Sequence, residues 1–149
     1  MPLAEIFLSH SSGDRAFATR LATALRGHGL SVWFSRDRIH GARQWHDAIG
    51  AALGRCGWFL LVLSPDSVRS QWVKRELMFA LNDRRYVERI VPIVLRKCAV
   101  KRLSWTLDAL QRVPPEGVFA SDFDGNVDRL LRIWGQEPDR RRRRSRRHA

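Results

Sequence analysis

The sequence predicts an α/β fold in which a parallel β-sheet is covered by helices on both faces. Short apolar segments typical of strands alternate along the 149 residues with segments whose apolar residues recur at helical spacing. The connections are short, which is what successive β-α-β units produce. The run WFLLVL at 58–63 is apolar throughout, as expected of a strand at the centre of a parallel sheet.

Each element can be placed in order along the chain. Five segments have the composition of strands: 5–10, 30–34, 58–63, 89–95 and 117–120. Four segments carry an apolar helical face: 14–26, 45–53, 71–84 and 126–134. Residues 64–67 are predicted to form a turn. Pro92 cannot donate a ladder hydrogen bond, so the fourth strand is predicted to lie near a sheet edge or a bulge.

The topology that fits five such strands is the flavodoxin-like three-layer sandwich with strand order 2-1-3-4-5. In that order a ligand binds outside the carboxyl ends of strands 1 and 3, where the winding reverses. Those ends are Ser9-His10 and Leu63-Ser64. We therefore expect the loop after the first strand and the start of the third helix to meet there.

The positive charge is unevenly distributed. Of the net charge of +12, residues 139–149 contribute +6, from seven arginines and one aspartate. Such a run repels itself and has nothing to pack, so we expect a folded domain at 1–135 and a disordered Arg-rich tail at 136–149. We favour a solvated tail over a contact with nucleic acid or an anionic surface, because charge alone gives only non-specific attraction.

Other classes of protein are disfavoured by composition. The longest apolar run is far shorter than the roughly 20 residues that span a bilayer, and the N-terminus lacks the pattern of a secretory signal. Cys56 and Cys98 have no metal-like or redox-like spacing, which favours a cytoplasmic protein. Asp37 and Asp47 have no further ligands at useful spacing, so we expect no metal site.

One carboxylate is a candidate for chemistry. A helical wheel of 71–84 places Trp72, Glu76 and Phe79 on a stripe beside the core stripe, so Glu76 is predicted to lie at the rim of the core. A carboxylate there could be partly desolvated and still reach a ligand. From the pattern alone, the alternative is a surface glutamate paired with a lysine or arginine.

Several motifs together resemble the TIR (Toll/interleukin-1 receptor) domain, and within it the branch that cleaves NAD. They cover residues 4 to 134 and stand in the family's order: Ile6-Phe7-Leu8-Ser9-His10-Ser11-Ser12-x-Asp14, Val32-Trp33-Phe34, Leu60-Leu61-Val62-Leu63-Ser64, Ser70-x-Trp72-x-x-x-Glu76-Leu77 and Ile90-Val91-Pro92-Ile93. The chain departs from the family pattern at Ser35, where many members have an acidic residue, and at Gly41-Ala42, where many have Pro-Gly.

The resemblance implies a catalytic role for Glu76, which would stabilise the ribose as it acquires positive charge. Trp72 would stack on a ring of the dinucleotide. The other substrate-binding candidates are Ser9, His10 and Ser11 for the ribose or phosphates, Trp33, and Arg36, Arg38 and Arg43 for the pyrophosphate. Alternation along a strand favours a core or interface position for Trp33 over ligand stacking. NAD is the substrate, and no further cofactor is expected.

The function implied by the resemblance is an NAD+ nucleosidase that releases nicotinamide and ADP-ribose or a cyclic isomer. Relatives of this kind are activated by TIR–TIR self-association, and a nucleotide product implies an effector protein that senses it. The resemblance suggests a bacterial anti-phage defence component, with interference in host TIR signalling as another role. The alternative function is a non-catalytic TIR scaffold that acts only through protein interaction.

Overall fold

The computed structural model of the chain describes residues 4–34 and 42–137, and of residues 42–46 it describes the backbone alone. The strands are β1 (Ile6–Ser9), β2 (Val32–Trp33), β3 (Trp58–Leu63) and β4 (Ile90–Val94). The α-helices are α1 (Arg15–Gly27), α2 (Ala42–Arg55), α3 (Pro65–Arg69), α4 (Gln71–Leu81) and α5 (Phe123–Ile133). Short 3-10 helices connect them: η1 (Ser12–Asp14), η2 (Arg84–Tyr86), η3 (Val100–Arg102), η4 (Trp105–Ala109) and η5 (Phe119–Asp122).

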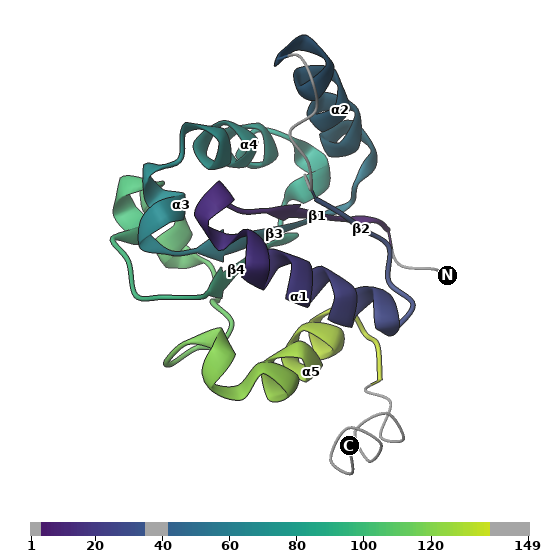
Figure 1. The fold of residues 1–149 in the computed structure, drawn as a ribbon, viewed down its shortest axis with the longest axis vertical. Helices are drawn as coiled ribbons and strands as arrows, with labels where there is room; N and C mark the ends of the chain where they lie inside the picture. Colours follow the sequence, from purple (N-terminus) through teal and green to yellow (C-terminus); the bar gives the residue numbers. More distant parts are fainter. Residues whose placement is uncertain (1–3, 35–41, 138–149) are drawn as a thin grey trace.

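The strands form one parallel sheet with the order β2-β1-β3-β4. β1 lies between β2 and β3, with Ile6 opposite both Val32 and Trp58. The α/β fold class and the order of its first four strands are thus confirmed. Because β1 and β3 are neighbours and parallel, the segments that follow them leave the sheet at the same edge (Figure 1).

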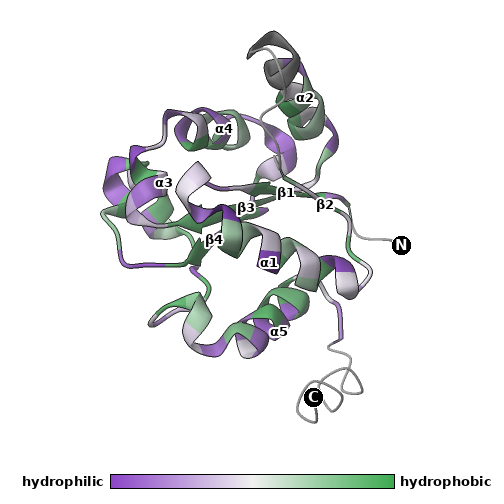
Figure 2. Ribbon diagram, viewed as in Figure 1, coloured by the Kyte–Doolittle hydropathy of each residue, from purple (hydrophilic) through white to green (hydrophobic). Residues whose placement is uncertain are grey.

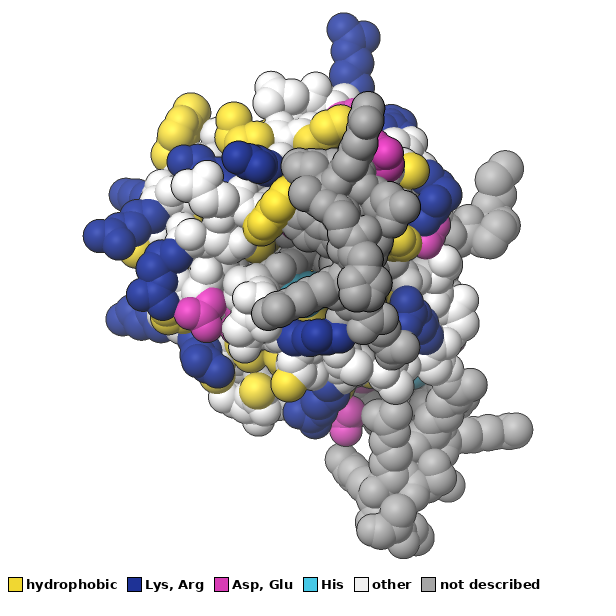
Figure 3. Space-filling model, turned by 45° about the horizontal axis from the view of Figure 1, so that its top comes forward, with side chains coloured by type: hydrophobic (Ala, Val, Ile, Leu, Met, Phe, Trp, Pro, Cys, Tyr) yellow, Lys and Arg dark blue, Asp and Glu magenta, His cyan; other side chains and the backbone are white. Residues whose placement is uncertain are grey.

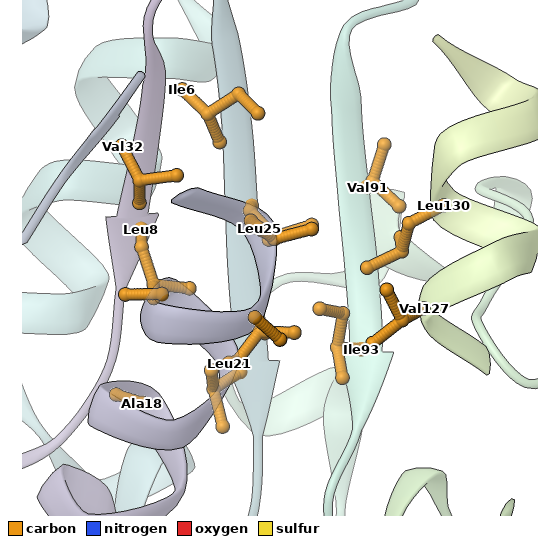
Figure 4. Close-up of a cluster of buried hydrophobic side chains, with 14 of the residues drawn as sticks. Ile6, Leu8, Ala18, Leu21, Leu25, Val32, Val91, Ile93, Val127 and Leu130 are labelled. Atoms are coloured by element: carbon orange, nitrogen blue, oxygen red, sulfur yellow. The ribbon is translucent and has the colours of Figure 1, made fainter. Parts of the chain in front are cut away.

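Helices cover both faces of the sheet, as the sequence predicts. α1 and α5 pack on one face, where Leu21, Leu25 and Leu130 meet strand residues such as Leu8 and Ile93 (Figure 4). α2 and α4 pack on the other face, over Phe7, Phe59 and Leu61. The strands are hydrophobic and the helices have mixed hydropathy, which is the pattern of a central sheet between two helical layers (Figure 2).

The predicted fifth strand at 117–120 is wrong. Phe119 begins η5 instead, and its ring packs into the core against Phe17 and Phe123, with ring centroids 5.5 Å away in each case. The outer side of β4 pairs with a single residue, Val113, which donates to the Pro92 carbonyl and accepts from the Val94 amide, both at 2.9 Å. Pro114 and Pro115 follow and have no N–H, so a ladder cannot extend from Val113.

Two further boundaries differ from the predictions. The predicted turn at 64–67 is the start of α3. The predicted helix 71–84 ends at Leu81, because Asn82 donates its side-chain amide to the Met78 carbonyl and Asp83 caps η2. Pro92 lies in β4, which is the last strand in the sheet order, so the expected place near an edge is confirmed.

The folded part of the chain extends at least to Trp134, which is buried and meets the ring of Trp58 edge-on. The tail segment 138–149 lies outside the described residues, so the domain division at 135 stays a prediction. No helix in 4–34 or 42–137 combines the length and apolarity needed to cross a membrane.

Phe119 should act as a core anchor and not as a strand residue. Phe119→Ala removes a fully buried ring, so the free energy of unfolding should fall by about 3–5 kcal/mol. Val118→Ala, at the half-buried neighbouring position, should cost about 1 kcal/mol or less. Urea unfolding of both variants measures the difference, and equal losses would contradict the anchoring role.

Candidate functional site

The site lies at the carboxyl ends of the two central strands. β1 ends at Ser9, which is paired with Leu61 of β3, and η1 follows within three residues. β3 ends at Leu63, and Ser64 then caps α3. The strand order therefore brings the turn after β1 and the start of α3 to one edge of the sheet.

Local sequence fixes how α3 and α4 leave this edge. Ser64 and Ser67 form a capping box, in which the Ser67 amide donates to the Ser64 hydroxyl at 3.0 Å and the Ser64 amide donates to the Ser67 hydroxyl at 2.8 Å. Pro65 occupies the first turn of α3, where a missing N–H costs nothing. Ser70 ends α3 and also caps α4, whose Val73 amide donates to its hydroxyl.

Glu76 is more deeply buried than the helical wheel predicts. It is 9% exposed and lies on the buried face of α4 with Val73, Leu77 and Ala80, while Trp72 and Phe79 are 37% and 43% exposed. Positions 73, 76, 77 and 80 are one helical face by spacing, and the acidic residue obscured this in the sequence. The Ser9 hydroxyl donates to Glu76 Oε1 at 3.3 Å.

Burial changes the acidity of Glu76. Loss of hydration raises its pKa from an ordinary 4.5 to about 8, and the hydrogen bond from Ser9 opposes that shift. A carboxyl group that titrates near neutral pH and lies at the carboxyl ends of the central strands is the kind of group found at functional sites.

The sequence analysis missed Asp14 as part of this region. The residue is 2% exposed, and its carboxylate caps neither η1 nor α1. Instead Oδ2 accepts hydrogen bonds from the Ser11 hydroxyl, at 2.8 Å, and from the Ser64 hydroxyl. An available signal was the cluster of small polar residues that directly follows each of two apolar strands.

The two tryptophans among the candidates differ in environment. Trp72, on the first turn of α4, presents part of its ring to solvent, with the Arg75 guanidinium 5.3 Å from the ring centroid. Trp33 is half-buried and stacks on Phe7, with centroids 5.0 Å apart, so it packs with the core on the α2–α4 side of the sheet.

His10 points away from the Ser9–Glu76 pair. Its ring lies 5.8 Å from that of Phe34, just after β2. Its Nδ1 lies 2.8 Å from the Ser11 carbonyl oxygen. Because a carbonyl oxygen can only accept, Nδ1 is the donor in this hydrogen bond. In the neutral imidazole Nε2 is then an acceptor. Arg36 and Arg38 lie outside the described residues, as does the Arg43 side chain.

Comparison with known proteins decides the family. A model of the TIR domain matches residues 6–131. The chain belongs to the TIR domain family. Similar solved TIR structures include the metazoan TIR-STING receptor from C. gigas in complex with 2',3'-cGAMP (TM-score 0.70, 22% identity, 91% of this chain and 40% of that one). Another is the TIR domain of the Toll-related receptor TRR-2 from Hydra magnipapillata (TM-score 0.62, 20% identity, 85% and 97%). At these identities the likeness shows the shared TIR fold.

Two curated relatives are similar over part of this TIR domain. One is named a probable 2' cyclic ADP-D-ribose synthase, TcpO, from Methanobrevibacter olleyae, and is 28% identical over 91 residues. The other is named a 2' cyclic ADP-D-ribose synthase, BtTIR, from Bacteroides thetaiotaomicron, and is 30% identical over 74 residues. The matches cover 60% and 49% of this chain, but 27% and 26% of those proteins.

The buried carboxyl group should make the stability of this TIR domain depend on pH. Folded Glu76 keeps its proton up to about pH 8, whereas the unfolded chain loses it near 4.5. The unfolded state therefore binds fewer protons in this window, and Glu76 lowers stability as pH rises through it. A pKa unit corresponds to about 1.4 kcal/mol. Relative to wild type, the free energy of unfolding of Glu76→Gln should therefore rise by a few kcal/mol between about pH 5 and pH 8.

Urea unfolding of wild type and Glu76→Gln across this pH range tests the expectation. Glu116→Gln makes the same change at an exposed glutamate. Its free energy of unfolding should depend on pH in the same way as that of wild type. A constant difference between Glu76→Gln and wild type at all pH values would contradict the raised pKa.

Proposed function

We propose that this TIR domain cleaves NAD+ at the bond between nicotinamide and ribose, with Glu76 as the catalytic carboxylate. The observation that carries the proposal is the buried Glu76 carboxyl group, hydrogen-bonded to Ser9 at the carboxyl ends of the central strands. The names of the two curated relatives, a 2' cyclic ADP-D-ribose synthase and a probable one, support the same class of chemistry.

One carboxylate is enough for this reaction. When the bond breaks, both electrons stay on the pyridinium nitrogen, so nicotinamide leaves as a neutral molecule and no general acid is needed. The ribose acquires oxocarbenium character, which the negative charge of Glu76 would stabilise in a site with little water. An attacking hydroxyl then bonds to the ribose carbon that nicotinamide has left. The hydroxyl loses its proton, which the carboxylate can accept.

The raised pKa fits a carboxylate that is ionised by its substrate. Without ligand, Glu76 holds a proton at neutral pH. The nicotinamide ring of NAD+ is a cation, and a positive charge nearby favours the ionised form of a carboxyl group. Binding would therefore generate the charge that the reaction needs, at the place where it is needed.

The remaining contacts follow from position and charge. The half-exposed Trp72 ring is suited to stacking on a ring of the dinucleotide. Ser9, whose hydroxyl contacts Glu76, remains a proposed contact with the ribose or phosphates, as do His10 and Ser11. Lysine and arginine side chains are spread over the face drawn in Figure 3, with sparse carboxylates between them. Such a surface attracts a pyrophosphate, for which Arg36, Arg38 and Arg43 remain the proposed ligands.

The proposed product is a cyclic ADP-ribose, formed when a hydroxyl of the same molecule attacks in place of water. The relatives' names favour the cyclic isomer over linear ADP-ribose. We also propose activation by self-association, which the exposed apolar side chains of α4 support: Trp72, Met78 and Phe79. A cyclic nucleotide signal would act through an effector protein that binds it.

Removal of the charge should abolish turnover. Glu76→Gln keeps the size of the side chain but cannot ionise, so nicotinamide release should fall by at least about 100-fold, the usual scale for losing such a group. Release is measured by chromatography at low and high protein concentration, with Glu116→Gln as the matched control. Turnover retained in Glu76→Gln would refute the catalytic role. No release by wild type at any concentration would favour the scaffold.

Wild-type turnover should also depend on pH in a defined direction. If the free enzyme must lose a proton from Glu76, kcat/KM rises with pH and levels off above about 8. The profile of kcat should level off at lower pH, because bound NAD+ favours the carboxylate. A kcat/KM that is flat from about pH 6 to pH 9, after subtraction of uncatalysed NAD+ breakdown, would contradict the assignment.

A further inference from the structure

We propose that Asp14 is a positioning residue, which holds the Ser9 hydroxyl against the Glu76 carboxylate by fastening the turn after β1 to the start of α3. The effect of Asp14 on turnover rests on the proposed function. Its effect on Glu76 itself does not, and that effect is what the experiment measures.

The Asp14 carboxylate joins two segments that are 50 residues apart. Its Oδ2 atom accepts from the Ser11 hydroxyl, on its own turn, and from the Ser64 hydroxyl at the end of β3. The other oxygen, Oδ1, is buried without a hydrogen-bond partner in the described residues. Burial of a carboxylate is unfavourable, and hydrogen bonds to a charged acceptor are among the stronger ones. Asp14 thus acts as a cross-link and not as a surface helix cap.

The cross-link leads directly to the helix that carries Glu76. The Ser64 hydroxyl donates to Asp14 and accepts from the Ser67 amide within the capping box of α3. Ser70 alone separates α3 from α4, as the C-cap of the first helix and the N-cap of the second. Gly13, in the same turn, lies close to α3, because a Cβ atom there would lie 2.5 Å from Asp66 Oδ2.

β1 and the turn after it are therefore bonded to the helical segment at two points. One is the Ser11–Asp14–Ser64 link, which is buried. The other is the hydrogen bond from Ser9 to Glu76, which at 3.3 Å is beyond the usual range for O–H···O bonds. A bond that long weakens further if the end of β1 shifts relative to α4, and the Ser11–Asp14–Ser64 link, which begins two residues after Ser9, opposes such a shift.

This arrangement has a measurable consequence for Glu76. Two effects shift its pKa, burial upward and the Ser9 hydroxyl downward. Loss of the Asp14 link should weaken the second effect, so the pKa should rise. Charged groups also lie on the elements that pack against α4 and on α4 itself, none of them among the causes of the shift: Asp47, Arg55, Asp66, Arg69, Lys74, Arg75, Arg84 and Arg85.

The test is a titration of the Glu76 carboxyl group by carbon NMR in the ligand-free protein. Asp14→Ala should raise the pKa of Glu76 by no more than Ser9→Ala, and the double variant should shift it no further than Ser9→Ala alone. Asp14→Asn keeps an oxygen that can accept both hydroxyls and should restore the wild-type value. An unchanged pKa in folded Asp14→Ala, or full additivity in the double variant, would overturn the proposal.

Two further variants keep the test decisive. If Asp14→Ala fails to fold, Ser11→Ala removes one arm of the link, and it should still raise the pKa of Glu76; no shift would overturn the proposal. Asp122→Ala is the matched control, since it deletes an aspartate that caps α5, far along the chain from the site. It should lower stability without changing the titration, and an equal shift there would reduce Asp14 to a general structural role.

The readout separates this proposal from the proposed function. If wild type releases no nicotinamide but the pKa of Glu76 shifts as expected, the proposed function fails and the positioning role stands. If turnover depends on Glu76 but its pKa ignores Asp14, the positioning role fails alone. If both the proposed function and the positioning role hold, Asp14→Ala should shift the pH profile of kcat/KM to higher pH, and Ser9→Ala should shift it in the same direction.

Discussion

The parallel pairing of β1 with β3 is the constraint on which the rest of the structure depends. Their register, with Ser9 opposite Leu61, ends both strands at one edge of the sheet. Ser9 is placed near Glu76 because it ends β1, and the α3–α4 segment that carries Glu76 begins directly after β3. The apolar residues that hold the pair together, such as Phe7 and Phe59, stack on each other under α2 and α4. The core and the site are therefore consequences of the same pairing.

Much of the fold could be predicted from the sequence because its signals are local. The apolar run at 58–63 and the helical periodicities predicted the layers, and the flavodoxin-like topology that suits such layers predicted the order of four strands. The false fifth strand shows the limit, since Phe119 has strand-like neighbours and its packing against Phe17 is a contact between distant residues. The start of α3 was available locally, because Ser64, Pro65 and Ser67 have the pattern of a capped helix start.

The location of the candidate site could be predicted from the sequence, but the extent to which Glu76 is buried could not. The spacing of Trp72 and Glu76 placed both residues on one helix, and the fold topology placed the start of that helix near the carboxyl ends of the central strands. The wheel assigned Glu76 to the rim, because a charged residue is normally excluded from a core stripe. The structure shows how the Glu76 carboxyl group is accommodated in the core: it accepts a hydrogen bond from Ser9 on β1, a contact that the helical wheel does not include. The role of Asp14 depends on contact with Ser64 across 50 residues, which no local pattern contains.

Ser70 is the single residue between α3 and α4, and its backbone is extended. With one linker residue, the relative direction of the two helices is set by the two backbone dihedrals of Ser70. The helix that bears the carboxylate is thus coupled to the helix bonded to the β1 turn through one residue. Insertion of a further residue beside Ser70 would add two free dihedrals and loosen the position of Glu76 relative to that turn.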